Sequence, residues 1–110
     1  MFFHKELTEK KWQSMPTIDQ MANIGTEIDR TIKWRASDAT LSLAAFNRGI
    51  ELLDATIGDP KNTNSLKELC RVRELLVGHF YFNNMHEFKD EEWHRYFMFF
   101  CHASAVARGF

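Results

Sequence analysis

The chain has 110 residues and a formal net charge of −1 at pH 7, and 45% of its residues are hydrophobic. This length and apolar content suffice for one hydrophobic core, so we expect a single domain over residues 1–110 rather than a disordered chain. The near-zero charge argues against a general nucleic-acid binder. No apolar run resembles a signal peptide or the roughly 20 residues that span a bilayer, so we expect a cytoplasmic protein without membrane contact.

Residues 1–16 mix aromatic residues with lysines and glutamates, and we expect either a short helix or an arm laid on the rest of the domain. A first long helix is predicted from Thr17 to about Trp34, where Thr17 and Gln20 have the spacing of a capping box. Its inward stripe consists of Ile18, Met21, Gly25, Ile28 and Ile32. A glycine on such a stripe indicates the close approach of another helix, with a kink as the alternative.

The segment Asp38–Ile57 predicts a second long helix, which Asp38 caps and which Gly58 and Pro60 end. Its main apolar stripe has steps of three and four residues: Leu43, Phe46, Ile50, Leu53 and Ile57. A thinner stripe on the other side consists of Leu41, Ala45 and Leu52. A helix that is apolar on two sides has neighbours on two sides, so we place this helix centrally.

Two further helices complete the predicted fold. Ser65 and Glu68 form a second capping-box pattern, which begins a helix that ends before Asn83. Its stripe consists of Leu66, Leu69, Leu76, Val77 and Phe80. The acidic run that starts at Asp90 suits the positive end of the last helix, which closes at Gly109. Four helices with short connections predict an all-α, antiparallel four-helix bundle with an additional N-terminal arm or short helix.

The last predicted helix is apolar on both sides. Met98, Phe99 and Val106 lie about opposite the inward stripe that starts at Trp93 and Phe97. A four-helix monomer would leave these three side chains in water, and exposed patches of that kind mark interfaces. We therefore expect a homodimer through this face. The alternative is that the N-terminal arm covers it with its aromatic residues, Phe2, Phe3 and Trp12.

Arg73 falls within the apolar stripe of its helix, where a cation is costly unless it is paired. Asp54 and Asp29 lie at the edges of their own inward stripes and are its natural partners. We expect a buried or half-buried ion pair that fixes the register of the helices. A functional arginine in a polar pocket is the alternative.

The chain predicts no metal site and no cofactor. A di-iron bundle needs two Glu-x-x-His elements, and only Glu91–His94 has that spacing, in an exposed first turn. His79 lies off the apolar stripe of its helix, which argues against haem, and a glycine-rich phosphate loop is absent. Cys70 and Cys101 are far apart within apolar helical patterns, which predicts buried free thiols.

Arg95 and His102 are seven positions apart, about two helical turns, and therefore share one face. It is the same face that carries Met98, Phe99 and Val106. An arginine and a histidine at an interface can hold a phosphate and move a proton, the two requirements of metal-independent RNA cleavage. The alternative is an ordinary polar rim beside an apolar interface.

An arginine followed by four to six residues and a histidine, on a helix of a small bundle, resembles the HEPN superfamily. The segment RYFMFFCH (Arg95 to His102) has this form, and so does RELLVGH (Arg73 to His79). The resemblance implies a prokaryotic helical protein, commonly a dimer, that acts as a toxin ribonuclease or as the partner of a small nucleotidyltransferase. A polar residue usually follows the arginine in HEPN ribonucleases. Tyr96 departs from this pattern whereas Glu74 fits it, so the active pair stays open.

Three longer segments, NIGTEIDRTIKW, RGIELLDATIGDPKN and LKELCRVRELLVGHF, are similar to a group of small uncharacterised prokaryotic proteins. This resemblance implies a compact cytoplasmic helical protein.

Two functions remain open: a non-catalytic dimeric interaction module, which is the preferred hypothesis, and a HEPN-like ribonuclease with Arg95 and His102 at the dimer seam. RNA is a partner only under the second hypothesis, which predicts that the two copies of His102 approach each other across the two-fold axis.

Overall fold

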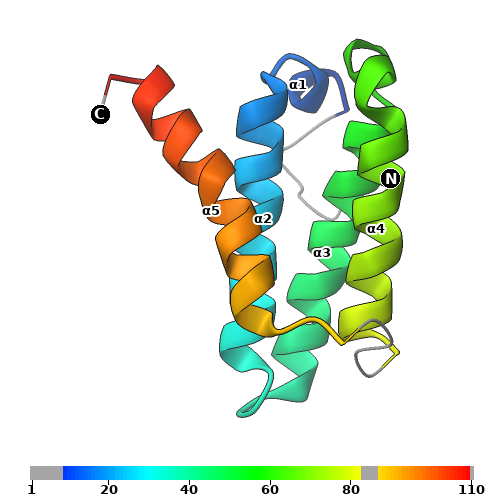
Figure 1. Ribbon diagram of the computed structural model, residues 1–110, viewed down its shortest axis with the longest axis vertical. Helices are drawn as coiled ribbons and strands as arrows, with labels where there is room; N and C mark the ends of the chain where they lie inside the picture. Colours follow the sequence, from blue (N-terminus) through cyan, green and yellow to red (C-terminus); the bar gives the residue numbers. More distant parts are fainter. Residues whose placement is uncertain (1–8, 83–86, 110) are drawn as a thin grey trace.

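A computed structural model describes residues 9–82 and 87–109. All regular structure in these residues is helical, which confirms the predicted all-α class. The elements are α1 (Glu9–Gln13), α2 (Thr17–Trp34), α3 (Ala39–Ile57), the 3₁₀ helix η1 (Pro60–Ser65), α4 (Leu66–Phe80) and α5 (Asp90–Ala107). Figure 1 shows the four long helices side by side, with successive helices running in opposite directions. Within the described ranges, no helix is long and apolar enough to cross a membrane.

The helix boundaries follow local capping signals only in part. The Oδ1 atom of Asp38 accepts a hydrogen bond from the backbone N–H of Leu41 at 3.1 Å, so the predicted cap of α3 is confirmed. The capping box predicted at Thr17 is wrong, because α2 begins at Thr17 itself and the hydroxyl of Thr17 donates to Asn62 Oδ1. Ser65 also makes no side-chain cap to α4.

The helices pack in the order α5, α2, α3, α4, so that α2 and α3 each lie between two neighbours. The central position predicted for Asp38–Ile57 is therefore confirmed, and four residues of the predicted stripes are buried: Ala45, Phe46, Leu52 and Leu53. Two other members of these stripes, Leu41 and Leu43, are 44% and 49% exposed. The middle of the buried face consists of small or polar residues with a seven-residue spacing, Ser42, Gly49 and Thr56. Ser42 and Gly49 let α2 and α3 approach closely, because Ser42 Oγ bonds to the carbonyl of Thr31 and a Cβ at Gly49 would lie 3.3 Å from Cβ of Glu27.

The glycine on the inward stripe of α2 marks a helix contact, as predicted. A Cβ atom added at Gly25 would lie 2.6 Å from Cβ of Phe97 on α5, a distance that real Cβ atoms do not show. The close approach of α2 and α5 therefore depends on the absence of a side chain at this position.

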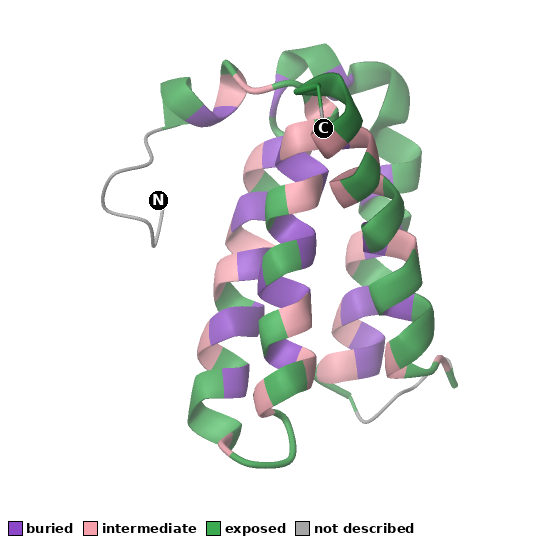
Figure 2. Ribbon diagram, turned by 90° about the vertical axis from the view of Figure 1, so that its left-hand side faces the viewer, coloured by how far each residue is buried: buried purple, intermediate pink, exposed green. Residues whose placement is uncertain are grey.

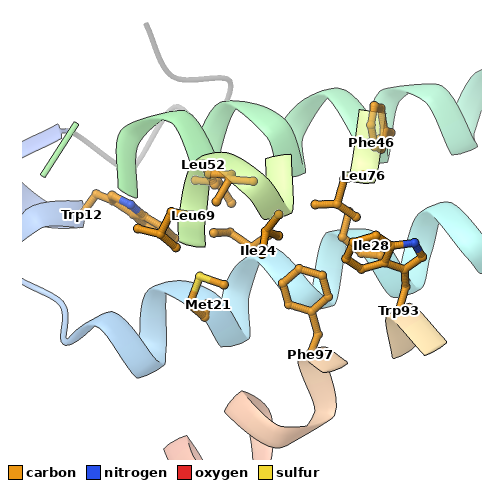
Figure 3. Close-up of a cluster of buried hydrophobic side chains, with 12 residues drawn as sticks. Trp12, Met21, Ile24, Ile28, Phe46, Leu52, Leu69, Leu76, Trp93 and Phe97 are labelled. Atoms are coloured by element: carbon orange, nitrogen blue, oxygen red, sulfur yellow. The ribbon is translucent and has the colours of Figure 1, made fainter. Parts of the chain in front are cut away.

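The large buried hydrophobic side chains of the described residues form one cluster that runs along the domain. Figure 3 shows Trp12 of α1 at one end of this cluster and Trp93 of α5 at the other. Figure 2 shows that buried residues follow the facing sides of the helices, while the outer sides are exposed. The largest fully buried side chains include Trp12, Phe97, Met21, Ile24, Ile28, Leu52, Leu53 and Leu76.

A polar network surrounds Trp12 and anchors α1. The indole Nε1 of Trp12 donates to Thr56 Oγ1 at 3.0 Å, and Gln20 Nε2 donates to the carbonyl of Trp12 at 2.8 Å. Gln20 also donates to Asp59 Oδ2 at 3.0 Å and accepts from Asn62 Nδ2 at 3.1 Å. These five residues are all buried, so the network ties α1, α2, α3 and the segment around η1 to one another.

Both cysteines are free, as predicted. Their predicted burial is wrong for Cys70, which is exposed on α4, and Cys101 on α5 is only partly buried. The apolar residues around Cys70 in the sequence face a different side of α4, because Leu69 points into the core.

Candidate functional site

The two faces of α5 differ in what they contact. Trp93, Phe97 and Ser104 are buried against the rest of the domain. On the opposite side of the helix, five residues form what we call the outward face: Arg95, Met98, Phe99, His102 and Val106. Figure 1 shows α5 at the edge of the molecule, beside α2.

The outward face is apolar in its middle and has one cation and one imidazole. Met98, Phe99 and Val106 are 50%, 67% and 55% exposed. Arg95 and His102 are also exposed, and within residues 9–82 and 87–109 neither side chain has a hydrogen-bond or ion-pair partner. Within the described ranges, these five side chains are therefore not occupied by other parts of the domain.

Cover by the N-terminal arm is the alternative that the sequence predicts for this face. Trp12 takes no part in such cover, because it is 1% exposed and lies in the core with its indole bonded to Thr56 of α3. Phe2 and Phe3, the other two aromatic residues of the expected arm, lie outside the described residues.

The two ends of α5 carry opposite charges. Its first turn contains Asp90, Glu91 and Glu92, of which the last two are exposed. Arg108 follows its last residue, with a side chain that is 60% exposed and 3.8 Å from Asp19 of α2. The acidic end suits the positive end of the helix dipole and Arg108 suits the negative end.

The structure pairs Arg73 with Asp54. Arg73 Nε lies 2.6 Å from Asp54 Oδ1, Nη2 lies 3.4 Å from Oδ2, and these hydrogen bonds raise the pKa of the guanidinium. The side chains are 40% and 50% exposed, so the pair is half-buried at most and desolvation costs it little. Asp29 does not join them. Its Oδ1 is instead 2.9 Å from Nδ1 of His94 on α5.

One cluster was not predicted from the sequence. His79 is 2% exposed, and its Nε2 lies 2.7 Å from Asp90 Oδ1. Arg35, which follows α2, donates to the same oxygen at 2.7 Å and to the carbonyl of His79 at 3.3 Å. The expectation that His79 lies off the inward side of α4 is wrong, because its imidazole packs edge-on against Phe80 and faces Trp93.

This Arg35–Asp90–His79 cluster joins the ends of α2, α4 and α5. A histidine held by a carboxylate is the geometry of an acid–base pair, but here the imidazole is buried and Arg35 occupies the same carboxylate oxygen. A solute in water has no access to the imidazole. The cluster therefore connects the ends of three helices. No local sequence signal connects its members, since they belong to three separate elements.

A small pocket of about 180 Å³ lies beside this cluster, between the end of α2 and the start of α3. Arg35 and Phe80 form one side of it, and the guanidinium lies 5.0 Å from the centre of the Phe80 ring. Its polar side chains already take part in hydrogen bonds: Ser42 Oγ donates to the carbonyl of Thr31 at 2.8 Å, Thr31 Oγ1 donates to the carbonyl of Glu27, and Arg35 donates to Asp90.

The two candidate Arg–His pairs differ in the structure. Arg73 is bonded to Asp54 and His79 to Asp90, so these two residues belong to separate interactions. Arg95 and His102, in contrast, share the outward face of α5, and both are exposed. Among the described residues, no three His, Cys, Asp or Glu side chains gather as the ligands of a metal ion would.

Comparison of the chain with protein-family models, with curated proteins and with solved structures found no match. The outward face of α5 is therefore the candidate site on physical grounds alone.

Proposed function

We propose that this protein is a non-catalytic interaction module of a prokaryotic cytoplasm, an antiparallel four-helix bundle that forms a homodimer through the outward face of α5. The observation that supports it is the exposure of Met98, Phe99 and Val106 on the side of α5 directly opposite its buried face. Three large apolar side chains on one helix face exceed the scattered single ones that are normal on a monomer surface.

The size of the exposed apolar face predicts a weak dimer. Full burial of a Met, Phe or Val side chain contributes about 1.5–3 kcal/mol, and these side chains are already about half buried. Two copies contribute six such side chains, or roughly 5–9 kcal/mol in total. Association costs at least about 4 kcal/mol, so these side chains leave a net gain of at most about 5 kcal/mol. We therefore expect a dissociation constant of roughly 0.1–1 mM or weaker from the apolar contacts alone, and tighter binding requires contacts at the rim.

The test is sedimentation equilibrium or light scattering of the full chain over a wide range of protein concentration. We expect a concentration-dependent dimer, and we expect Phe99→Glu to abolish it without loss of helix content. The matched control is Tyr81→Glu, because Tyr81 is 61% exposed but lies at the end of α4. A chain that stays monomeric at the highest concentration, or a dimer that Phe99→Glu leaves intact, contradicts the proposal.

The alternative function is a HEPN-like, metal-independent endoribonuclease with Arg95 and His102 at the dimer seam. The observation that favours it over other catalytic functions is that both side chains are exposed, unbonded within the described ranges and on one face. Because the chain resembles HEPN proteins, we also propose that the interaction module binds a protein partner such as a small nucleotidyltransferase. Incubation of mixed RNA with the protein and with His102→Ala separates the two functions, because only the ribonuclease predicts cleavage that this variant loses.

A further inference from the structure

We infer that the partner of the outward face is a second copy of α5 in antiparallel orientation, with the two-fold axis passing between Met98 and Phe99. This inference rests on the proposed dimer and adds to it the direction and the register of the two helices.

The pattern of the outward face is centred on that axis. Met98 and Phe99, two of its three apolar residues, are adjacent at the middle of the face, and Arg95 and His102 lie about one turn to either side. In an antiparallel pair with this axis, Met98 of one copy meets Phe99 of the other. An isologous interface requires a patch of this kind, which complements itself after a rotation of half a turn.

The charges distinguish this arrangement from a parallel pair. A parallel pair with the helices in register places Glu91 opposite Glu91 and Arg95 opposite Arg95, and like charges that face each other across an interface are costly. The antiparallel pair places Arg95 beside His102 of the second copy, so that neither the two Glu91 carboxylates nor the two Arg95 guanidinium groups face each other. It also places Glu91 beside Val106 of the second copy.

The ends of the helix favour the same direction. In the antiparallel pair, the acidic first turn with the exposed side chains of Glu91 and Glu92 lies within about one turn of Arg108 of the second copy. Arg108 is 60% exposed, but its guanidinium lies on the α2 side of α5, 3.8 Å from Asp19, so it contributes long-range attraction rather than a direct ion pair across the seam. The opposed helix dipoles add a smaller favourable contribution.

Disulfide trapping tests the orientation directly. The starting protein is Cys70→Ser/Cys101→Ala, which lacks both native thiols. Glu91→Cys is introduced into one sample and Val106→Cys into another, and the samples are oxidised separately and as an equal mixture. Both substituted residues are exposed, so neither change disturbs the core, and circular dichroism verifies the helix content of each sample. The matched control carries Asn47→Cys, at an exposed position of α3 that is remote from the proposed seam.

We expect the mixture to give mainly the heterodisulfide between positions 91 and 106, with each single sample cross-linking no more than the Asn47→Cys control. Homodisulfides in the separate samples, without the heterodisulfide, would overturn the antiparallel arrangement while leaving the dimer in place. A protein that is monomeric in solution and cross-links no better than the control would overturn the proposed dimer and this inference together.

Discussion

Gly25 of α2 faces Phe97 of α5 so closely that a Cβ atom on Gly25 would lie 2.6 Å from Cβ, 3.1 Å from Cγ and 3.3 Å from Cδ1 of Phe97. Phe97 is 1% exposed and lies near the middle of the core cluster. The nearest atom is the Cβ of Phe97, which is fixed to the backbone, so a rotamer change cannot relieve the contact. This pair of residues sets the distance between α2 and α5.

Substitution of Gly25 by alanine is therefore expected to destabilise the protein. Overpacking of a core costs roughly 1–3 kcal/mol, and the gain in helix propensity offsets up to about 1 kcal/mol of that cost. We expect a net loss in the free energy of unfolding, measured by urea denaturation. The control is Gly58→Ala, because a Cβ at Gly58 meets only ordinary contacts at 3.5 Å and its φ is −76°. Equal stability of the two variants would show that α5 moves freely on α2.

The buried carboxylate of Asp59 predicts how stability changes in acid. Burial by itself raises the pKa of Asp59, but hydrogen bonds from Lys61 and Gln20 outweigh it and hold the pKa below its ordinary value of 3.8. A lowered pKa in the folded state contributes stability that is complete above the ordinary pKa and is lost as the pH falls through the folded-state value. We expect Asp59→Asn to be less stable than the native chain at neutral pH and to lose less stability on acidification.

A companion variant separates this cause from a general acid effect. Lys61→Met removes the strongest of the hydrogen bonds that lower the pKa of Asp59. The loss of stability should then begin at a higher pH than in the native chain. Thermal unfolding measured from pH 7 to pH 3 checks both variants. If Lys61→Met loses stability over the same pH range as the native chain, Lys61 is not what lowers the pKa of Asp59.

The hydroxyl of Tyr96 is expected to destabilise the folded protein. It is buried and is not hydrogen-bonded within the described part of the chain, and desolvation together with the charge of Glu68 raises the pKa of Tyr96 to about 12. Removal of an unsatisfied buried hydroxyl is neutral or stabilising, so Tyr96→Phe should raise the free energy of unfolding by up to roughly 1 kcal/mol. Tyr81→Phe, at a residue that is 61% exposed, serves as the control and should change little.

The alkaline pH dependence provides a second measurement on Tyr96. The pKa of Tyr96 is raised from its ordinary value of 10.0 to about 12 in the folded state, so the folded protein holds the phenol proton more tightly than the unfolded chain does. The stability that comes from this difference is therefore complete below pH 10.0 and is lost as the pH rises towards about 12. Tyr96→Phe should lose less stability over that interval than the native chain. If the two proteins lose stability in parallel, Tyr96 is accessible to water in solution.

The class of the fold and many helix boundaries could be predicted because their causes are local. Asp38 caps the helix that begins beside it, Gly58 follows its last residue, and the acidic run at Asp90 begins α5. Gly25 is also informative, because a glycine inside a helix lowers its stability and is typical of a position where a neighbouring helix comes close. Each of these signals lies within a few residues of the structure that it specifies.

The buried polar residues could not be predicted in the same way. Gln20, Ser42, Thr56 and His79 are all less than a tenth exposed, yet a search for apolar stripes assigns such residues to the surface. Their burial depends on partners that are distant in sequence, as Trp12 is for Thr56 and Asp90 for His79. For Arg73 the search makes the opposite error, because it assigns a residue on an apolar stripe to the interior. This position lies near the edge of the buried face of α4, and the Arg73 side chain is 40% exposed.

The two thiols are expected to react at different rates. Cys70 is exposed on α4. Burial and the charge of Asp29 raise the pKa of Cys101, so at a given pH a smaller fraction of Cys101 is thiolate than of a cysteine with the ordinary pKa. The thiolate is the reactive form, and we expect the native chain at pH 8 to react with a thiol reagent in a fast and a slow phase. Cys70→Ser should remove the fast phase and Cys101→Ala the slow one. Raising the pH from 8 to 9 should then accelerate the slow phase, and a single fast phase for both thiols would show that Cys101 is as accessible as Cys70.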